Sequence, residues 1–297
     1  MIDKLEFLLA LAREGHFRRA AEACGVTQPT LSAGVKQLEQ DFGILLVNRG
    51  SRFQNFTPEG ERVLEWARRI VGDTRAMREE VHALKNGLRG QLRISVSPPA
   101  LGMIETLTTL YHERHPEVQF TILANNAEDI FRQLENLEID AGISFLGGEP
   151  TGRITGIPLY RERYCLLTAA DAPLGNRTKV KWAEVAQIPL CLLTPDTQLR
   201  RIIDSLLRDA GGDPRPSLES NSMIVLYSHV RTGRWASVMP FRLAATLGLT
   251  EVLRAIPIVE PDANHMIGLL VPSRQPMKPL TAALVAESRR AAQLLAG

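Results

Sequence analysis

The stretch Phe17-Arg-Arg-Ala-Ala-Glu-Ala-Cys-Gly-Val-Thr-Gln-Pro-Thr-Leu-Ser-Ala-Gly-Val-Lys-Gln-Leu-Glu39 decides the fold of the N-terminal region. Its pattern predicts two short helices with a turn at Gly25, because a left-handed turn position favours glycine. Thr27 suits the N-cap of the second helix, and Pro29 suits its first turn, where a missing N–H costs little. The apolar residues of the second helix recur at helical spacing and are expected to face inward: Leu31, Val35 and Leu38.

The outward face of the second helix carries short polar side chains on its first turns. Such side chains reach base edges and phosphates when a helix enters the major groove. The hairpin alone does not establish DNA binding, since other helical hairpins also have caps, a glycine and an apolar stripe. In the DNA-binding interpretation, the contacts would come from Arg18, Arg19, Thr27, Gln28, Pro29, Thr30, Ser32 and Lys36.

The flanks of the hairpin predict a three-helix core followed by a wing. An apolar stripe marks an earlier helix that would close the core: Leu5, Leu8, Leu9 and Ala12. Residues 48–52 and 53–56 are typical of a tight turn between two short strands. Arg49 and Arg52 would then lie against the phosphate backbone, although charged loop residues are more often simply solvated.

A long amphipathic helix is expected next. Thr57-Pro-Glu-Gly60 combines an N-cap, a proline at the first helical position and an early acid. A helix over 58–86 would be about 45 Å long, too long to bury its apolar seam inside a small domain. The seam therefore predicts a partner helix and a dimerisation strut. Its residues are Val63, Ala67, Ile70, Thr74, Met77, Val81, Leu84 and Leu88.

Together these segments resemble the N-terminal region of LysR-type transcriptional regulators. The resemblance rests on Phe17, Ala20-Ala21, Val26-Thr-Gln-Pro-Thr-Leu-Ser32, Leu38-Glu39, Phe42-Gly43, Leu46, Arg49, Thr57-Pro-Glu-Gly60 and Leu88-Arg-Gly-Gln-Leu-Arg-Ile94. The chain departs from the family pattern at Ala33-Gly34, so no base contact is expected at position 33. Residues 17–24 and 48–52 also resemble regulators of formate dehydrogenase operons.

The resemblance implies a domain layout and a mode of action. It implies a winged helix-turn-helix domain over 1–57 with the motif at about 17–39, a linker and dimerisation helix over 58–88, and an effector-binding domain over 91–297. Such a regulator forms a homodimer or homotetramer and reads an interrupted palindrome in double-stranded DNA. It responds to a small-molecule effector, and RNA polymerase is a further candidate partner. The sign of regulation stays open.

After residue 90 the pattern changes to short strands alternating with helices. This predicts an α/β domain with a largely parallel sheet. Strands are expected at 92–97, 118–123, 141–145, 153–168, 190–193 and 265–272, with a helix at 101–114. The family's effector domain is similar to periplasmic solute-binding proteins, with two lobes around a hinged cleft. That likeness implies lobe one at 91–161 and 267–297, and lobe two at 162–266.

The expected ligand of this cleft is a small carboxylate or a similar anion. Ligands of such sheets lie beyond the carboxyl ends of the strands, at helix N-termini whose free N–H groups favour negative charge. Ser and Thr at helix starts are also ordinary caps, so each candidate has a structural alternative. The candidates are Ser97, Pro99, Ser144, Phe145, Thr194, Thr197, Asn221 and Ser222. Among them, Ser97 and Thr194 resemble positions that contact effectors in family members.

Composition narrows these interpretations. The 297 residues suffice for two or three units, and the formal net charge is only +2. Residues 1–60 carry seven basic and seven acidic side chains, so tight DNA binding is expected to need paired half-sites. No apolar run reaches the length of a membrane span. Asp3, Lys4 and Glu6 in the first turn are unlike a secretory signal, so a cytoplasmic protein is expected.

The alternatives are a small-solute-binding protein and a thiol redox sensor on the same fold. Three cysteines in a cytoplasmic chain argue against structural disulfides, and Cys24, Cys165 and Cys191 are expected to be buried. A peroxide sensor of the resembled family would have its reactive cysteine where this chain has Gln198. No hydrolase, nucleotide-binding or metal-ligand motif is present, so neither an enzyme nor a cofactor is expected.

Overall fold

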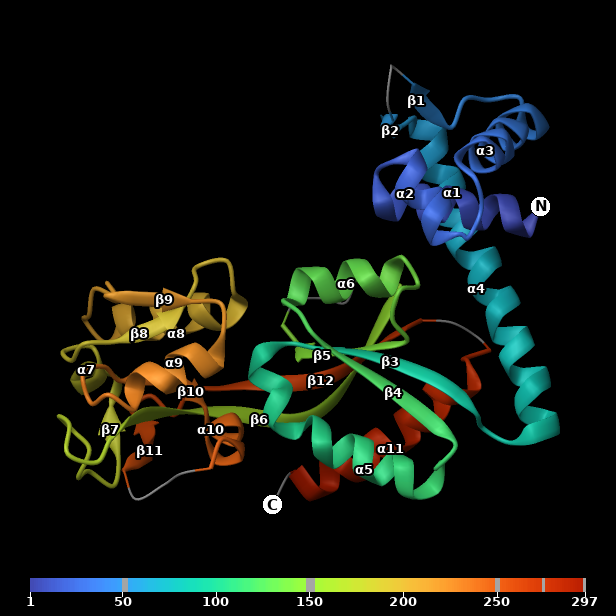
Figure 1. Cartoon of the computed structure of the whole chain (residues 1–297). Coiled ribbons are helices and arrows are strands. Elements are labelled where there is room, and N and C mark those ends of the chain that lie inside the picture. The colour runs from blue at the N-terminus through green and yellow to red at the C-terminus, as the bar shows by residue number, and fades with distance from the viewer. Residues whose placement is uncertain (50–52, 148–152, 249–251, 274–275, 296–297) are drawn as a thin grey trace. The chain divides into compact units, whose positions relative to one another are not determined.

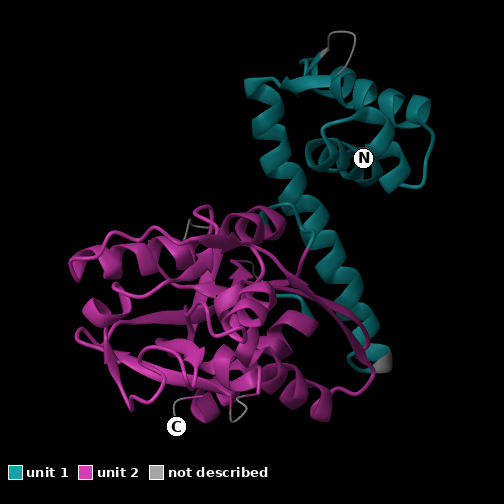
Figure 2. Cartoon of the chain, turned by 60° about the vertical axis from the view of Figure 1, so that its left-hand side comes forward, with its two compact units in different colours: residues 1–88, 135–138, 274–279 teal, residues 89–134, 139–273, 280–297 magenta. Residues whose placement is uncertain are grey.

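The computed structural model describes residues 1–49, 53–147, 153–248, 252–273 and 276–295. The chain forms two compact units (Figures 1 and 2). Unit 1 contains residues 1–88, 135–138 and 274–279, and unit 2 contains residues 89–134, 139–273 and 280–297. Among the described residues, no helix is long and apolar enough to cross a membrane.

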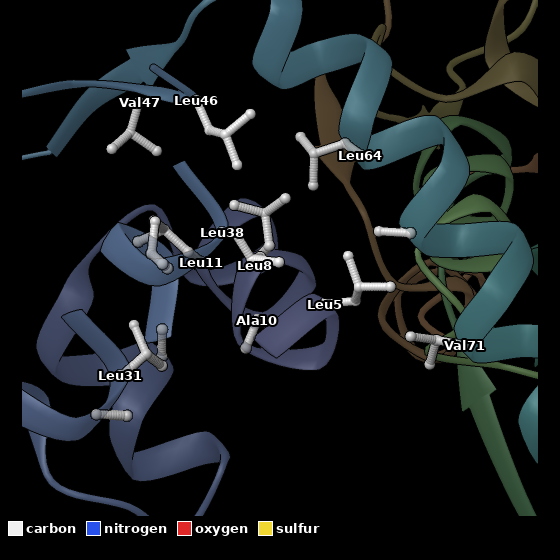
Figure 3. Packing of buried hydrophobic residues seen from close by; sticks show 14 residues of the cluster. Leu5, Leu8, Ala10, Leu11, Leu31, Leu38, Leu46, Val47, Leu64 and Val71 are labelled. Atoms are coloured by element: carbon white, nitrogen blue, oxygen red, sulfur yellow. The ribbon is translucent and has the colours of Figure 1, made fainter. Parts of the chain in front are cut away.

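Unit 1 is a helical bundle with a two-stranded hairpin. Its elements are α1 (Ile2–Glu14), α2 (Phe17–Ala23), α3 (Gln28–Phe42), β1 (Val47–Arg49), β2 (Phe53–Phe56) and α4 (Pro58–Asn86). Leu8 and Leu11 of α1 pack against Leu31 and Leu38 of α3, with no exposed surface on any of the four (Figure 3). Leu64 of α4 belongs to the same cluster, so the first turns of α4 complete the core.

The turn between α2 and α3 has the cap and the glycine conformation that the sequence predicts. Thr27 is extended and its hydroxyl accepts from the Thr30 N–H, which caps α3. Gly25 has φ +66°, the left-handed conformation expected of the turn. Ala20 and Ala21 of α2 are fully buried, which lets α1 and α3 approach closely.

The start of α4 is fastened to the chain before the hairpin. The Thr57 hydroxyl accepts from the Gly60 N–H at 2.9 Å and donates to the Leu45 carbonyl at 2.7 Å. A Cβ on Gly60 would lie 2.0 Å from the Leu46 carbonyl oxygen, closer than any real contact. The motif Thr57-Pro-Glu-Gly60 is therefore a packing requirement as well as a helix start.

Unit 2 is an α/β unit with an eight-stranded sheet in the order β4-β3-β5-β12-β6-β11-β7, in which β10 pairs with β6. The strands are β3 (Gly90–Val96), β4 (Val118–Ala124), β5 (Ala141–Phe145), β6 (Ile154–Ala169), β7 (Val180–Lys181), β10 (Ser237–Pro240), β11 (Leu253–Val259) and β12 (Asn264–Pro272). β8 (Cys191–Leu193) and β9 (Leu218–Ser220) form a separate parallel pair.

The expectation of a largely parallel sheet was wrong. β3 pairs in parallel with β4 and β5, but β12 pairs antiparallel with β5 and β6, and β10 and β11 pair antiparallel with β6. The cause is the topology, since the long strand β6 lies between strands that all run against it. Hydrophobic periodicity does not encode strand direction.

Helices cover both faces of the β3–β4–β5 part of the sheet (Figure 1). α5 (Ile104–Arg114) and α11 (Pro279–Leu295) lie side by side, joined by a hydrogen bond from the Tyr111 hydroxyl to the Leu280 carbonyl. α6 (Ala127–Glu135) covers the opposite face. The helix expected at 101–114 begins as a 3-10 turn, η1 (Pro98–Met103). The remaining helices are α7 (Trp182–Val185), α8 (Gln198–Asp209), α9 (Met223–Val230) and α10 (Phe241–Thr246).

Candidate functional site

The first turns of α3 present a polar surface. Four of the predicted DNA-contacting residues on this helix are exposed, and Ser32 is half-buried. The exposed four are Gln28, Pro29, Thr30 and Lys36. Thr27 caps the helix, and its hydroxyl lies 2.9 Å from that of Thr30. A helix whose exposed end carries amides, hydroxyls and one lysine has the donors and acceptors that base edges and phosphates require.

The arginines of α2 have partners within unit 1. Arg18 pairs with Glu22 one turn later at 3.0 Å, and Arg19 donates to the Glu14 carbonyl. Both arginines remain exposed. An exposed ion pair contributes little to stability. Breaking the Arg18–Glu22 pair would therefore cost little free energy if the Arg18 guanidinium bonded to a phosphate instead.

The hairpin β1–β2 is fixed to α2 by aromatic packing. The rings of Phe17 and Phe53 meet edge to face with centroids 6.2 Å apart, and the amides of Asn48 and Asn55 bond across the strands at 2.7 Å. The backbone of Arg49 pairs with Phe53. Arg52 lies outside the described residues, so its predicted phosphate contact stays a prediction.

The departure at Ala33-Gly34 has a structural reason. A Cβ on Gly34 would lie 2.7 Å from the ring of Phe7 on α1, whereas Ala33 is exposed. Gly34 therefore lies close to α1, and a larger side chain at this position would require the Phe7 ring to move.

The apolar seam of α4 is exposed over most of its length. The exposed fractions of Ile70, Met77, Val81 and Leu84 are 40%, 58%, 52% and 82%. Val63 is half-buried. Four exposed apolar side chains along one face of a helix are the pattern expected of a protein–protein contact, so the dimerisation role of this seam stays a prediction.

The assignment of Ala67 to that seam needs correction. Ala67 has no exposed surface and packs, with Leu64 and Val71, into the core of its own unit. Trp66, which is 58% exposed, occupies the free face instead. The sequence prediction missed Trp66 because α4 carries two apolar faces side by side, and the heptad pattern alone does not separate them.

A small hollow in unit 2 gathers five of the eight predicted effector residues. Ser97, Pro99, Ser144, Phe145 and Thr197 all line it. The other lining residues were not predicted: Pro98, Asn126, Ala127, Leu193, Gln198 and Leu199. Asn126, which follows β4 and caps α6 by accepting from the Asp129 N–H at 2.8 Å, carries the same strand-to-helix signal that identified Ser97.

Two buried hydroxyls in this hollow have no hydrogen-bond partner. Ser97 is 3% exposed and Ser144 is fully buried, yet neither Oγ bonds to any described residue. A buried hydroxyl without a protein partner costs free energy, so both hydroxyls are candidates for a hydrogen bond to a ligand or a water molecule in the hollow.

The N-terminus of α8 faces the same hollow. Thr197 caps this helix by accepting from the Arg200 N–H at 3.3 Å, so its own hydroxyl has a structural role. Gln198 and Leu199 are its first residues, and helix geometry leaves their N–H groups without intrahelical partners. Free N–H groups and the positive end of the helix dipole favour an anion.

The remaining three candidates do not line the hollow. Thr194 lies beside it, where its N–H donates to the Ser220 carbonyl at 3.2 Å, and its buried hydroxyl has no described partner. Asn221 is exposed, and Ser222 precedes α9 without a side-chain cap. These three stay predictions.

None of the three cysteines lines the hollow. Cys165 and Cys191 are buried, and Cys24 is half-buried against the core of unit 1. Burial raises the pKa of all three thiols, to about 11 for Cys191. Gln198 holds the first position of α8, where a reactive thiol would meet the helix dipole.

Known proteins match both units. Residues 2–61 match the family "Bacterial regulatory helix-turn-helix protein, lysR family", and residues 85–293 match "LysR substrate binding domain". The chain is 28% identical over 279 residues to the "DNA-binding transcriptional dual regulator OxyR" of Escherichia coli (strain K12), covering 93% of this chain and 91% of that protein. It is 30% identical over 213 residues to a "Probable hydrogen peroxide-inducible genes activator" of Streptomyces viridosporus, covering 71% and 67%.

Solved structures agree in fold over nearly the whole chain. A full-length OxyR variant from Pseudomonas aeruginosa superposes with a TM-score of 0.78 at 26% identity, covering 97% of both chains. The regulator CbnR in complex with its target DNA superposes with a TM-score of 0.63 at 20% identity, covering 98% of this chain and 99% of that one. The chain belongs to the LysR family and is a DNA-binding transcriptional regulator with an N-terminal helix-turn-helix and a C-terminal effector-binding domain.

Proposed function

We propose that this regulator reads an interrupted palindrome as a dimer and responds to a small anion bound in the hollow of unit 2. The observation that carries the effector assignment is the pair of unpartnered buried hydroxyls, Ser97 and Ser144, beside the free N–H groups of α8. The DNA assignment rests on the exposed polar start of α3.

In this proposal α3 enters the major groove, with Gln28, Thr30 and Ser32 toward the bases and Lys36 toward a phosphate. The exposed apolar seam of α4 joins two copies, which places one recognition helix at each half-site. Contacts between the unit 2 regions of different copies would extend the dimer to a tetramer. The protein would act in the cytoplasm, with RNA polymerase as its further partner, and would have no enzymatic activity.

A gel-shift assay at the protein's own promoter tests the DNA part. Lys36→Ala is expected to weaken binding about equally on all sequences and to lower the salt dependence, since a phosphate contact carries no base information. Gln28→Ala is expected to relax base preference at one position of each half-site. Lys179→Ala removes an exposed lysine of unit 2 and is the matched control. Unchanged binding by the Lys36 and Gln28 variants would contradict the assignment of α3.

Thermal-shift measurements on the full chain with a panel of small carboxylates test the effector part. Ser144→Ala is expected to reduce the stabilisation by any binding carboxylate, because the variant removes a donor from the hollow. Ser228→Ala is the control, because that hydroxyl donates to the Ile224 carbonyl within α9. Equal stabilisation of the Ser144 variant and the wild type would refute the site.

A thiol-based response is the second candidate, favoured only by the relatives' names, which include hydrogen peroxide-inducible activators. The raised thiol pKa values and Gln198 at the start of α8 speak against this mechanism here. The relatives named as activators support activation as the output of this regulator.

A further inference from the structure

The hollow at Ser97 and Ser144 is too small for a whole effector. Its volume is about 20 Å³. A single water molecule needs roughly 10–15 Å³ by this measure, whereas pockets for small-molecule ligands span roughly 300–1,000 Å³. The hollow therefore has room for a small head group such as one carboxylate, and the rest of the molecule must lie outside it.

A second, wider hollow adjoins the first along α8. Its volume is about 330 Å³, and its lining residues are Gln198, Arg201, Ile202, Ser205 and Leu206 of α8 with His265 of β12. Gln198 lines both hollows. Phe145, which lines the first, meets the ring of His265 edge to face at 5.8 Å between centroids. One ligand can therefore extend from the first hollow into the second.

Arg201 is the cation of the second hollow, and its bonding differs from that of the other arginines of α8. Arg200 is buried and bonds to Asp204 at 2.6 Å and to Glu219 at 2.7 Å. Arg208 also pairs with Asp204, at 3.6 Å. Arg201 pairs with no described carboxylate and donates only to the Asp196 carbonyl at 2.9 Å. It keeps N–H donors for a bidentate bond to a carboxylate.

The other lining groups fit a short carbon chain that ends in an anion. Ile202 and Leu206 supply apolar contacts next to Arg201, one helical turn apart on α8. The Nδ1 atom of His265 lies 2.7 Å from the Tyr164 hydroxyl, so Nε2 is the ring nitrogen left for a ligand. No acidic side chain lines either hollow among the described residues.

We propose that the effector is a short dicarboxylate, with one carboxylate at Ser97, Ser144 and the start of α8 and the other on Arg201. The first half of this assignment rests on the proposed function. The second subsite, at Arg201, is the part that goes beyond the proposed function. It favours a dicarboxylate, because a monocarboxylate bound at the first subsite would leave Arg201 without an anion. A charge-assisted bidentate bond contributes about tenfold or more to affinity.

Calorimetric titration of the full-length protein tests the second subsite. Succinate, glutarate and adipate are compared with butyrate, pentanoate and hexanoate, the monocarboxylates of equal carbon number. In the wild type, at least one dicarboxylate is expected to bind tenfold more tightly than its matched monocarboxylate. Arg201→Ala is expected to remove that preference and leave monocarboxylate affinity unchanged. Arg208→Ala, on the same helix, is the matched control and keeps the preference.

The outcomes separate this inference from the proposed function. If monocarboxylates bind as tightly as dicarboxylates and Ser144→Ala weakens both, the anion site stands and the dicarboxylate inference is overturned. Equal weakening of both classes by Arg201→Ala also overturns it, since that result indicates a structural role for Arg201. If neither class binds, the proposed anion site fails and the second subsite fails with it.

Discussion

Replacement of Gly60 by alanine is expected to detach the start of α4 from the hairpin segment. The new Cβ would lie 2.0 Å from the Leu46 carbonyl oxygen and 2.9 Å from its carbon. Two hydrogen bonds hold the Leu46 backbone in place. Its N–H donates to the Glu39 carboxylate at 3.0 Å, and its carbonyl accepts from the Thr57 N–H at 3.0 Å. Relief therefore requires a backbone shift of about 1 Å, taking a normal contact as roughly 3 Å.

The expected cost is about 1–4 kcal/mol. Overpacking against backbone costs about 1–3 kcal/mol and the loss of the Thr57–Leu46 hydrogen bond about 1 kcal/mol, while the helix propensity of alanine over glycine returns up to about 1 kcal/mol. Amide hydrogen exchange measures the loss of stability at individual residues, and faster exchange is expected at the amides of positions 46 and 60. Gel shift is expected to show weaker DNA binding, since the hairpin and α3 lose their support.

Gly34→Ala is the matched control within unit 1. Its Cβ would meet only side-chain atoms, Cδ2 and Cε2 of Phe7 at 2.7 and 3.1 Å and Cγ of Lys4 at 3.9 Å, and a side chain can turn away where a backbone carbonyl cannot. We expect a change within about 1 kcal/mol of the wild type, because the gain in helix propensity offsets the ring movement. Exchange rates at 46 and 60 that match the wild type in Gly60→Ala, or that rise equally in Gly34→Ala, would refute the packing argument.

Three further predictions concern oligomerisation, pH and oxidation. Leu84→Glu places a charge on the exposed seam and is expected to shift the protein toward monomer in sedimentation velocity, whereas Glu80→Gln, off the seam, leaves the mass unchanged. Burial raises the pKa of the Glu162 carboxyl, so the folded state binds this proton more tightly than the unfolded state does. The stability that the bound proton contributes is therefore lost as pH rises through the folded-state pKa. Glu162→Gln should remove that loss, measured as urea midpoints at pH 5 and 7.5; parallel slopes in both proteins would contradict it. Burial raises the pKa of all three thiols, to about 11 for Cys191, so each is mostly protonated at pH 7 and hydrogen peroxide should leave DNA binding unchanged in gel shift.

The sequence predicted best where the determinants are local. The cap at Thr27, the turn at Gly25 and the start of α4 at Pro58 each depend on a few neighbouring residues, and the structure has all three. The position of Ser97 and Ser144 at one hollow was predictable because each lies at the end of a strand of the sheet, whereas their role as ligand contacts stays a prediction.

The wrong predictions concern features that depend on contacts between residues far apart in the sequence. Ala67 and Trp66 are adjacent in sequence, and only the packing of α4 on its own unit shows which one is buried. The antiparallel pairing of β12 depends on a segment that returns from residues 264–272. The role proposed for Arg201 was not predicted, because an exposed arginine on a helix is usually solvated and its neighbour His265 lies more than sixty residues later in the chain.

The size of the first hollow also constrains how an effector acts. A ligand can shift a conformational equilibrium only by its difference in affinity between the two states. Ser97 and Ser144 lie at the ends of strands β3 and β5, whereas α8 follows β8 in the separate parallel pair, so a head group bound among them joins two parts of the effector unit. With only about 20 Å³ available, a small displacement of α8 would remove one side of the site. At the proposed site, affinity for the head group would therefore depend steeply on the position of α8, and a small effector bound there would favour one conformation of the regulator.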